Sequence, residues 1–457
     1  MALITKAVRG TLDLLPAESY KSQFVERSFF EIAQNFGYHE VRTPVFEHTE
    51  LFLRSVGETT DVVQKEMYTF TDRGERSLTL KPEGTAGAAR AFLEHGLFNE
   101  PLPQKMCYFT PCYRYDKPQA GRYREHHQLG VECFGAASPA ADAEIIALAY
   151  HTITFLGLEN IRLEINSIGC PECRKTYNDA LKAYFEAYTS ELCETCISRL
   201  DKTPMRILDC KSPVCAKIAE GAPSILEYIC EPCREHFEGL QRYLGAMDID
   251  FHVNAGVVRG LDYYTRTVFE FMTEDNGSMI TVCGGGRYDR LIEEIGGAPM
   301  PACGFGMGIE RLILQMERQN CTFPEPERCE LYIVSTDDAS SLFAARLATE
   351  MRDAGIPCQN DICGRSLKAQ MKYANKLRAR YTVVIGSNEI EAGKAAVKNM
   401  DTGASTNLPF HDFAENFMRM TLDEAVEAFD FSGMINEDGS VNGAGFTLLK
   451  GGKSDED

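Results

Sequence analysis

The cysteines of this chain are unevenly distributed, and eight of the 17 fall between residues 170 and 244. They form four pairs, and three pairs have the CxxC spacing that places two thiolates on one metal ion. The segment reads as mostly helical, which predicts a helical module inserted into the surrounding sequence. The paired residues are Cys170 with Cys173, Cys193 with Cys196, Cys210 with Cys215, and Cys230 with Cys233.

Two structural Zn²⁺ sites of four thiolates each are the preferred interpretation of these pairs. Reduced structural thiols and a redox response are the alternatives, and the spacing does not determine which pairs share an ion. Disulfides are disfavoured because the N-terminal sequence lacks the apolar core of a secretory signal.

The composition excludes several classes of protein. The chain has 457 residues and a formal charge of −20, which argues against a basic coat for nucleic acid. A hydrophobic content of 44% and a charged content of 25% are typical of a globular protein. No run approaches the ~18 apolar residues of a membrane span. We therefore expect a cytoplasmic protein with no membrane partner.

The pattern of the chain predicts five parts. Strand-like and helical runs before and after the cysteine-rich segment are expected to form one core. Pro324 and Pro326 mark a boundary, after which strands alternate with helices as in an α/β unit with parallel strands. A glycine-rich acidic end predicts a flexible tail. The expected parts are the core in two segments, 1–169 and 245–325, the insertion 170–244, the α/β domain 326–428, and the tail 429–457.

The segment Glu83-Gly84-Thr85 places a carboxylate and a hydroxyl beside a glycine that lets a ligand approach closely. The alternative is a solvated turn before a helix over 86–94, with Thr85 as the N-cap.

Two strand-like runs joined by a long basic loop predict a hairpin over residues 109–134. Arg114 and Arg122 could reach phosphate oxygens, which guanidinium groups bind in a bidentate manner. Gln128 and Glu132 are four residues apart and therefore share one face of the second strand. Surface charges on a solvated hairpin are the alternative, but two polar residues on one face of an apolar strand favour a pocket.

A glycine-rich strand over 304–308 is expected to pass directly into a helix that carries Arg311 near its start. Cations are not favoured at a helix N-terminus, so Arg311 is expected to face an anion or to stack on a planar ligand. An exposed helical arginine is the alternative. The glycines of 284–286 lack the lysine and the spacing of a phosphate-binding loop.

The order of these segments resembles that of a class II aminoacyl-tRNA synthetase. Residues 36–47 are similar to motif 1, residues 114–132 to motif 2 and residues 304–312 to motif 3. The segments Arg259-Gly-Leu-Asp-Tyr-Tyr264 and Gly285-Gly-Arg-Tyr288-Asp are similar to the pair that distinguishes histidyl-tRNA synthetases. The resemblance implies an α+β catalytic core on an antiparallel sheet, a C-terminal anticodon-binding α/β domain, and a homodimer joined through motif 1.

The resemblance also implies an activity, that of a histidine–tRNA ligase. Such an enzyme activates L-histidine with ATP and Mg²⁺ to histidyl-adenylate and pyrophosphate. It then transfers histidine to the 3′ end of tRNA(His). By this resemblance Arg114 would hold the α-phosphate, Arg122 the outer phosphates, and Arg311 the adenine or the γ-phosphate. Arg259 would lie across the α-phosphate and the histidine carboxylate, as a cation that cannot lose its charge.

The resemblance assigns the histidine pocket to residues from four segments. The substrate ammonium group is implied to meet the segment Glu83-Gly84-Thr85 and Gln128, while two side chains bind the imidazole nitrogens and two aromatic residues close the pocket. The imidazole partners are Glu132 and Tyr264, and the closing residues are Tyr263 and Tyr288. The family does not imply Zn²⁺ at the cysteine pairs. Zn²⁺ bound by these cysteines would fix the insertion, which in the family lies over the tRNA acceptor stem.

The basic segment 364–380 contains six Lys and Arg residues and no acid. The Lys residues recur every four positions opposite an apolar stripe that includes Leu367, which predicts a helix with one basic face. In the family this domain binds the anticodon, so Arg365, Lys368 and Lys372 are expected to contact tRNA phosphates. An ordinary solvated helix face is the alternative.

A second function from another class is the regulatory subunit of ATP phosphoribosyltransferase, a non-catalytic relative that binds histidine as a signal. Such relatives usually lack the anticodon domain and the arginines of the ATP site. This chain has Arg114, Arg259, Arg311 and the additional domain, which favours the enzyme.

Overall fold

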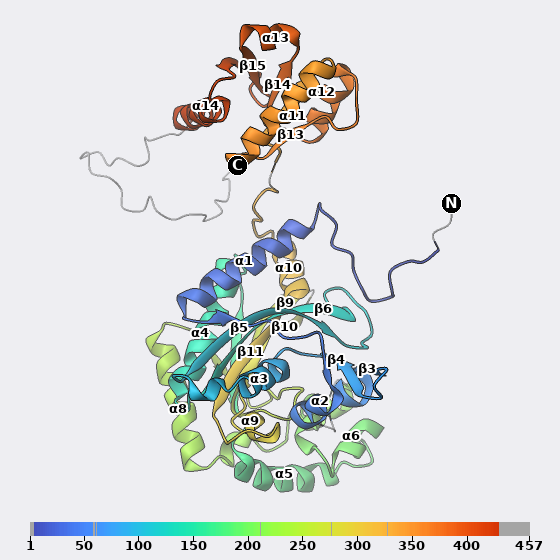
Figure 1. Cartoon of the computed structure of the whole chain (residues 1–457). Helices are drawn as coiled ribbons and strands as arrows, with labels where there is room; N and C mark the ends of the chain where they lie inside the picture. The colour runs from blue at the N-terminus through green and yellow to red at the C-terminus, as the bar shows by residue number, and fades with distance from the viewer. Residues whose placement is uncertain are drawn as a thin grey trace, which may run out of the picture. The chain divides into compact units, whose positions relative to one another are not determined.

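The structure is a computed structural model that describes residues 4–57, 60, 62–210, 212–275, 277–326 and 328–428. The chain forms two compact units, Met1–Pro324 and Glu325–Asp457 (Figure 1). The tail predicted over 429–457 lies outside the described residues. In the described part of the chain, no helix has the length and apolar character that a bilayer crossing requires.

The first unit is built on an eight-stranded sheet with the order β1-β5-β6-β11-β10-β9-β7-β8. All neighbouring strands are antiparallel except the two edge pairs, β1 with β5 and β7 with β8. The strands are β1 (His39–Glu40), β5 (Gln104–Tyr113), β6 (Glu125–Phe134), β7 (Arg162–Ser167), β8 (His252–Val253), β9 (Thr265–Asp275), β10 (Ser278–Arg287) and β11 (Ala302–Gly308).

Helices cover one face of this sheet with the main apolar core. Along β6 the residues Leu129, Val131 and Cys133 are buried in that core. The alternate residues Gln128 and Glu132 therefore face the opposite side of the sheet, because strand side chains alternate with a period of two. The covering helices are α1 (Ser19–Asn35), α4 (Pro139–Phe155), α8 (Glu231–Ala246) and α10 (Ile309–Arg318).

The opposite face carries the polar residues and a second, smaller core around Phe92, Phe134 and Tyr288. Short elements surround this face, including a three-stranded sheet with the order β2-β4-β3. They are β2 (Phe46–His48), α2 (Thr49–Val56), η1 (Val62–Glu66), β3 (Tyr68–Thr71), β4 (Ser77–Leu80), α3 (Thr85–Glu94), η2 (Leu97–Asn99) and α9 (Leu291–Glu294).

The insertion is helical, as the sequence predicts, and has an apolar core of its own that includes four of its cysteines. Three of its helices begin directly after a cysteine: Cys170, Cys193 and Cys230 are the N-cap residues. Besides α8, its helices are α5 (Pro171–Glu186), α6 (Glu194–Arg199), η3 (Pro204–Ile207), α7 (Pro213–Ala219) and η4 (Ile225–Glu227).

The second unit contains a five-stranded sheet with the order β13-β12-β14-β15-β16. The expected parallel strands are present, since β12 pairs in parallel with both β13 and β14. However, β15 and β16 pair antiparallel, because a turn at Gly403 folds them into a hairpin. The elements are β12 (Leu331–Ser335), α11 (Asp338–Asp353), β13 (Cys358–Asn360), α12 (Leu367–Lys376), β14 (Tyr381–Ile385), α13 (Ser387–Ala392), β15 (Lys394–Asn399), β16 (Ser405–Pro409) and α14 (Phe413–Ala428).

Candidate active site

A row of glycines crosses the middle of the large sheet. Gly306 of β11 pairs with Gly130 of β6 on one side and with Gly284 of β10 on the other. A Cβ atom on any of the three would overlap a neighbouring side chain, namely Tyr108 at Gly130, Gln128 at Gly306, and Arg259 at Gly284. The glycines therefore make room for these larger polar groups on the face of the sheet opposite the covering helices.

Glu132 is the buried acidic group of this face. Its carboxylate accepts hydrogen bonds from the hydroxyl of Tyr108, at 2.8 Å, and from the hydroxyl of Tyr288. Burial raises the pKa of the Glu132 carboxyl well above its usual range. The sequence did not single out Tyr108, and the signal for it is the pair of glycines, Gly84 and Gly130, on which its ring packs.

The predicted segment Glu83-Gly84-Thr85 lies next to Tyr108, the partner of Glu132. The buried carboxylate of Glu83 accepts hydrogen bonds from the backbone N–H groups of Thr85 and Ala86, both at 2.8 Å. Glu83 rather than Thr85 therefore satisfies the first turn of α3, and the alternative interpretation with Thr85 as the N-cap is wrong. The backbone N–H of Gly84 donates to Oε1 of Gln128 at 3.0 Å, which joins the two predicted parts of the pocket.

Three tyrosines form an aromatic wall beside Glu132. The ring centroids of Tyr263 and Tyr264 are 4.7 Å apart, and Tyr263 meets Tyr288 edge to face at 5.4 Å. All three side chains are buried, and burial raises the pKa of the Tyr263 and Tyr264 hydroxyls. The structure thus brings Glu132, Tyr263, Tyr264 and Tyr288 together.

Arg259 extends from the segment before these tyrosines and forms an ion pair with Glu270 of β9. The other oxygen of Glu270, Oε2, accepts a hydrogen bond from the Thr281 hydroxyl at 2.8 Å. Within the described part of the chain, the buried Nε of Arg259 has no hydrogen-bond acceptor. A buried donor without an acceptor is costly, so this guanidinium is suited to a ligand that brings oxygen atoms. The sequence assigned no role to Glu270.

Three of the predicted arginines line one cavity of about 320 Å³ together with Gln128. They are held from different elements. Nε of Arg114 donates to the carbonyl of Pro82 at 2.8 Å, and Nη1 of Arg311 donates to the carbonyl of Thr281 at 2.6 Å. The third, Arg122, pairs with Asp116.

The electrostatics of this cavity favour an anion. Burial and the neighbouring charge of Arg122 lower the pKa of Arg311, and Arg114 acts in the same direction. Burial and the charge of Arg114 lower the pKa of His126, in the cavity wall, to about 3, so that this ring is neutral. A cluster of like charges that raise one another's energy is relieved when a polyanion binds. Arg311 is partly buried at the third residue of α10 and is not an exposed surface arginine.

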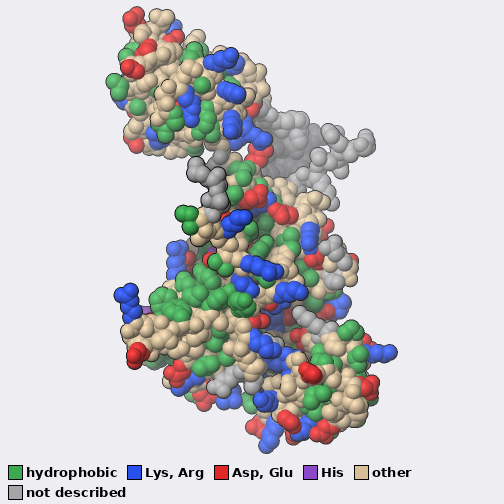
Figure 2. Space-filling view, turned by 90° about the vertical axis from the view of Figure 1, so that its right-hand side faces the viewer, with side chains coloured by type: hydrophobic (Ala, Val, Ile, Leu, Met, Phe, Trp, Pro, Cys, Tyr) green, Lys and Arg blue, Asp and Glu red, His purple; other side chains and the backbone are tan. Residues whose placement is uncertain are grey.

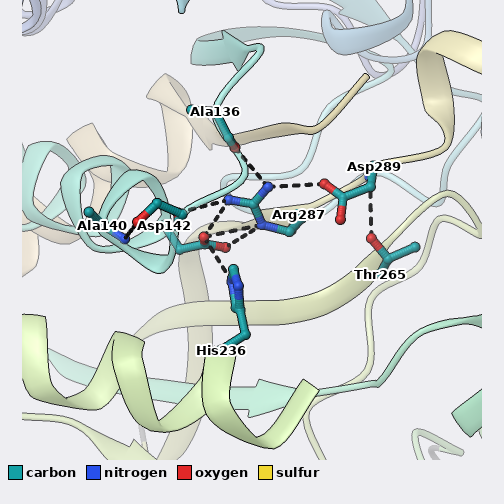
Figure 3. Close-up of polar contacts among 8 residues, drawn as sticks. Ala136, Ala140, Asp142, His236, Thr265, Arg287 and Asp289 are labelled. Carbon is teal, nitrogen blue, oxygen red and sulfur yellow. Dashed lines mark hydrogen bonds and ion pairs between the residues drawn. The ribbon is translucent and has the colours of Figure 1, made fainter. Parts of the chain in front are cut away.

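A further buried cluster lies behind the pocket, next to Tyr288 in the sequence. Arg287 and Asp142 are both fully buried and joined by an ion pair of 2.6 Å between Nη2 and Oδ2. Nε2 of His236 lies 3.1 Å from the same carboxylate oxygen, and Nη1 of Arg287 also binds Asp289 at 3.0 Å. Figure 3 shows the guanidinium of Arg287 between Asp142 and Asp289, with His236 next to the carboxylate of Asp142. It anchors the end of β10 to α4 and α8.

The structure shows which cysteines lie together. Cys170 and Cys173 meet Cys230 and Cys233, while Cys193 and Cys196 meet Cys210 and Cys215, with all ligand atoms of a group within 4.8 Å of one another. The Sγ–Sγ distances include 3.5 Å for Cys170–Cys173 and 3.8 Å for Cys193–Cys210. All eight are free thiols. The N–H of Cys196 and its thiol lower the pKa of Cys193 to about 7 although burial opposes them, which favours a thiolate.

In the second unit, the basic residues Lys368 and Lys372 on α12 are exposed. Arg365 precedes the helix, pairs with Asp361 at 2.6 Å and lies over the ring of Tyr373. The predicted apolar stripe needs one correction. Leu367 is exposed, and Gln370 is buried instead because its amide binds the backbone of Ser335. Figure 2 shows several Lys and Arg side chains close together on the visible face of this unit.

Comparisons with known proteins agree with this arrangement. The sequence matches the family described as Histidyl-tRNA synthetase over residues 10–173 and 217–312, and the family described as Anticodon binding domain over residues 330–420. The first match leaves out residues 174–216, which contain one complete group of four cysteines.

Two curated relatives are named histidine–tRNA ligase. That of Caldanaerobacter subterraneus is 55% identical over 406 residues, which are 89% of this chain and 97% of the relative. That of Clostridium botulinum strain Loch Maree is 56% identical over 398 residues, 87% of this chain and 95% of the relative. The crystal structure of apo histidyl-tRNA synthetase from S. aureus is 38% identical with a TM-score of 0.78, and the match covers 91% of this chain and all of that chain.

These matches place the protein among the aminoacyl-tRNA synthetases, which are ligases. The chain belongs to the histidyl-tRNA synthetase family. The family, the fold class and the class of enzyme predicted from the sequence are confirmed, and the regulatory alternative is not favoured.

Proposed function

We propose that this chain activates L-histidine with ATP, forming histidyl-adenylate and pyrophosphate, and then transfers the histidyl group to the 3′ end of tRNA(His). The observation that carries the proposal is the cavity of Arg114, Arg122 and Arg311, which shares Gln128 with the pocket around Glu132. A polyphosphate and a small polar substrate would therefore meet at Gln128. Such a reaction depends mainly on positioning and on cations that stabilise developing negative charge.

Arg259 is the proposed catalytic cation. Arg114 would hold the α-phosphate from the cavity, while Arg259 would approach it and the substrate carboxylate from the other side. The ion pair with Glu270 keeps the guanidinium in place before the substrates bind, and its unsatisfied Nε offers a donor to them. Substitution at phosphorus then proceeds between two fixed positive charges, without a covalent intermediate on the protein.

The pocket around Glu132 would select the amino acid. Glu132 and Tyr264 would bind the two imidazole nitrogens, while Tyr263 and Tyr288 would close around the ring, and Glu83, Thr85 and Gln128 would receive the ammonium group. The Glu132 carboxylate is held by Tyr108 and Tyr288, so it is oriented before the substrate binds. A smaller or apolar side chain would leave these buried groups unpaired, which rejects it.

Mg²⁺ would enter with ATP. It prefers oxygen ligands and commonly bridges substrate phosphates to one or two carboxylates. The carboxylates that line the arginine cavity are Asp116 and Glu310, and both are compatible with that role. Bound there, Mg²⁺ would neutralise phosphate charge.

Two structural Zn²⁺ ions are part of the proposal. A tetrahedral ion with Zn–S bonds of about 2.3 Å needs sulfur atoms about 3.8 Å apart. The Cys170–Cys230, Cys173–Cys233 and Cys193–Cys210 distances are 3.9, 4.0 and 3.8 Å, and thus support one ion in each group. The cytoplasm, where the enzyme is expected to work, keeps such thiols reduced and available.

The two remaining partners are tRNA and a second copy of the chain. Lys368 and Lys372 would contact anticodon-arm phosphates, and Arg365, held by Asp361, would support them. The homodimer would form through the face that bears motif 1. This face has exposed Val45 and Phe46 and an open apolar cavity of about 1130 Å³ lined in part by residues 41–51.

Histidine-dependent exchange of labelled pyrophosphate into ATP tests the activation step without tRNA. The wild-type protein should catalyse exchange, and Arg259→Gln should reduce kcat by roughly 100-fold or more with a smaller change in the KM for ATP. An Arg259→Gln variant as active as the wild type would refute the catalytic role of this cation.

A further inference from the structure

Two arginines of the cysteine-rich insertion, one from each cysteine group, contact a short segment that the active site depends on. This segment, residues 259–264, carries Arg259 at one end and the pocket residues Tyr263 and Tyr264 at the other. In the described part of the chain it belongs to no helix or strand, so its conformation depends on contacts from outside. Two of these contacts are arginines of the cysteine-rich insertion.

The first contact comes from the group of Cys170, Cys173, Cys230 and Cys233. Arg174 directly follows Cys173, and its Nη1 donates to the carbonyl of Tyr264 at 3.0 Å. The side chain is partly buried, and burial lowers its pKa. The position of Arg174 is therefore set by the cysteine beside it, and through its hydrogen bond it positions the backbone of a pocket tyrosine.

The backbone around this group supports the same connection. Arg266, two residues after Tyr264, has a φ of 51°, which is unfavourable for a residue with a side chain. Its N–H donates to the carbonyl of Gly169 at 2.9 Å, and its carbonyl accepts from the N–H of Ile168 at 2.7 Å. Cys170 follows directly, so the first cysteine group adjoins the backbone segment, Ile168 and Gly169, that holds this strained residue.

The second contact comes from the group of Cys193, Cys196, Cys210 and Cys215. Arg206 lies in η3, between the two halves of that group. Its Nη2 donates to the carbonyl of Gly260 at 2.7 Å and to Oδ1 of Asp262 at 2.9 Å. Both acceptors belong to the segment 259–264, so each cysteine group adjoins an arginine that binds this segment.

The secondary structure around the second group is too short to be stable alone. The helices α6 and α7 have six and seven residues, well below the ~12 that an isolated helix needs. Their buried cysteines, Cys196 and Cys215, make up part of the insertion's apolar core. A metal bound by four thiolates would supply the cross-link that these helices lack, with release of the thiol protons.

We infer that Zn²⁺ bound at the two cysteine groups holds residues 259–264 in the form that binds histidine, with Arg174 and Arg206 as the positioning residues. The inference rests on the proposed function and deepens it. It concerns histidine rather than ATP, because the arginines that line the ATP cavity are held by Pro82, Asp116 and Thr281, outside the insertion. Metal occupancy would thus change the KM for histidine, and kcat through Arg259, and leave the KM for ATP nearly unchanged.

The test combines metal content with kinetics of pyrophosphate exchange in the full-length protein. The wild type should contain two Zn²⁺ per chain by elemental analysis. The Cys193→Ser/Cys196→Ser variant should retain one, and its KM for histidine should rise about tenfold or more, while its KM for ATP stays within about twofold. Two Zn²⁺ in the wild type with an unchanged histidine KM in this variant would overturn the inference.

Substitution of the arginines separates positioning from folding of the module. Arg206→Met and Arg174→Met should keep both Zn²⁺ ions and raise the KM for histidine, while Arg174→Lys should restore most of the affinity because a lysine can still donate to one carbonyl. Lys217→Met, which removes an exposed cation from α7, is the matched control and should change neither constant. Equal KM values for histidine in Arg206→Met and the control would overturn the role of Arg206.

The triple variant Cys193→Ser/Cys196→Ser/Arg206→Met tests whether the cysteine group and Arg206 act through the same contact. Its KM for histidine should be little higher than that of the Cys193→Ser/Cys196→Ser variant, because both changes release the same contact. Additive effects would contradict the inference. Absence of exchange in zinc-loaded wild type would instead count against the proposed function, so the two failures are distinguishable.

Discussion

Arg287 and Asp142 form a fully buried ion pair that connects the end of β10 to the first turns of α4, 145 positions apart in the sequence. Tyr288, whose hydroxyl binds Glu132, is the next residue after Arg287. The pair therefore fixes the strand end from which a wall of the proposed histidine pocket projects. His236 of α8 joins the same carboxylate and extends the connection to the insertion.

Removal of this guanidinium should be costly. Arg287→Met leaves Asp142 buried without its main partner, so the free energy of unfolding should fall by about 3–5 kcal/mol in urea titrations. Arg290→Met, which removes an exposed arginine three residues later, should change stability by less than about 0.5 kcal/mol. A loss no larger than that of the control would show that the pair contributes little.

Glu132 should make stability depend on pH. Its pKa is raised in the folded protein, so the folded state binds a proton more tightly, and stability falls as pH rises above the usual glutamate value of about 4.3. Glu132→Gln should remove this loss and be more stable than the wild type at pH 7. The same variant should lose histidine-dependent exchange.

Denaturant titrations of both proteins between pH 4 and pH 8 check this point. The difference should grow with pH and vanish near the acidic end. A difference that is constant over the range would mean that Glu132 does not titrate as described.

The glycine row can be tested at Gly306. Gly306→Ala places a methyl group against the amide of Gln128, which must move away from both the arginine-lined cavity proposed to bind ATP and the N–H of Gly84. The KM values for ATP and histidine should both rise. Gly245→Ala in α8, where a methyl group meets nothing within 4 Å, is the control and should keep wild-type kinetics. Equal kinetics of the two variants would argue against a role for this close packing.

Arg311 should act on ATP alone. Arg311→Leu removes one of three cations from the cavity, and the KM for ATP should rise about tenfold, with little change in the KM for histidine. Exchange kinetics at two ionic strengths refine the test, since the wild type should lose ATP affinity with added salt more steeply than the variant. Identical salt dependence would place Arg311 away from the phosphates.

The basic helix of the second unit should affect tRNA and not activation. Lys368→Ala/Lys372→Ala should raise the KM for tRNA in aminoacylation several-fold and leave pyrophosphate exchange unchanged, because phosphate contacts contribute to affinity. Lys394→Ala removes an exposed lysine from β15 and serves as the control. A slower exchange reaction in the double variant would point to a folding defect instead.

Local patterns in the sequence were sufficient for part of this site. The alternation along 125–134 placed Gln128 and Glu132 on one face, and the glycine-rich strand before Arg311 does pass directly into a helix. Both depend on neighbours in the sequence, where periodicity is informative.

Contacts between segments that are distant in the sequence could not be predicted from such local patterns. Tyr108 meets Glu132 because of the register between β5 and β6, and Glu270 meets Arg259 from another strand. The pairing of the cysteines also depends on how α5 and α8 come together at their N-termini. Spacing along the chain determines none of these relationships, because each depends on tertiary packing.

The central claim is that this pocket selects histidine for adenylate formation. ATP–pyrophosphate exchange with each of the standard amino acids in turn, at equal concentration, tests it most directly. The structure predicts exchange with histidine and background rates with all the others. Exchange with a different amino acid, or with none in folded protein that still binds histidine, would contradict the claim.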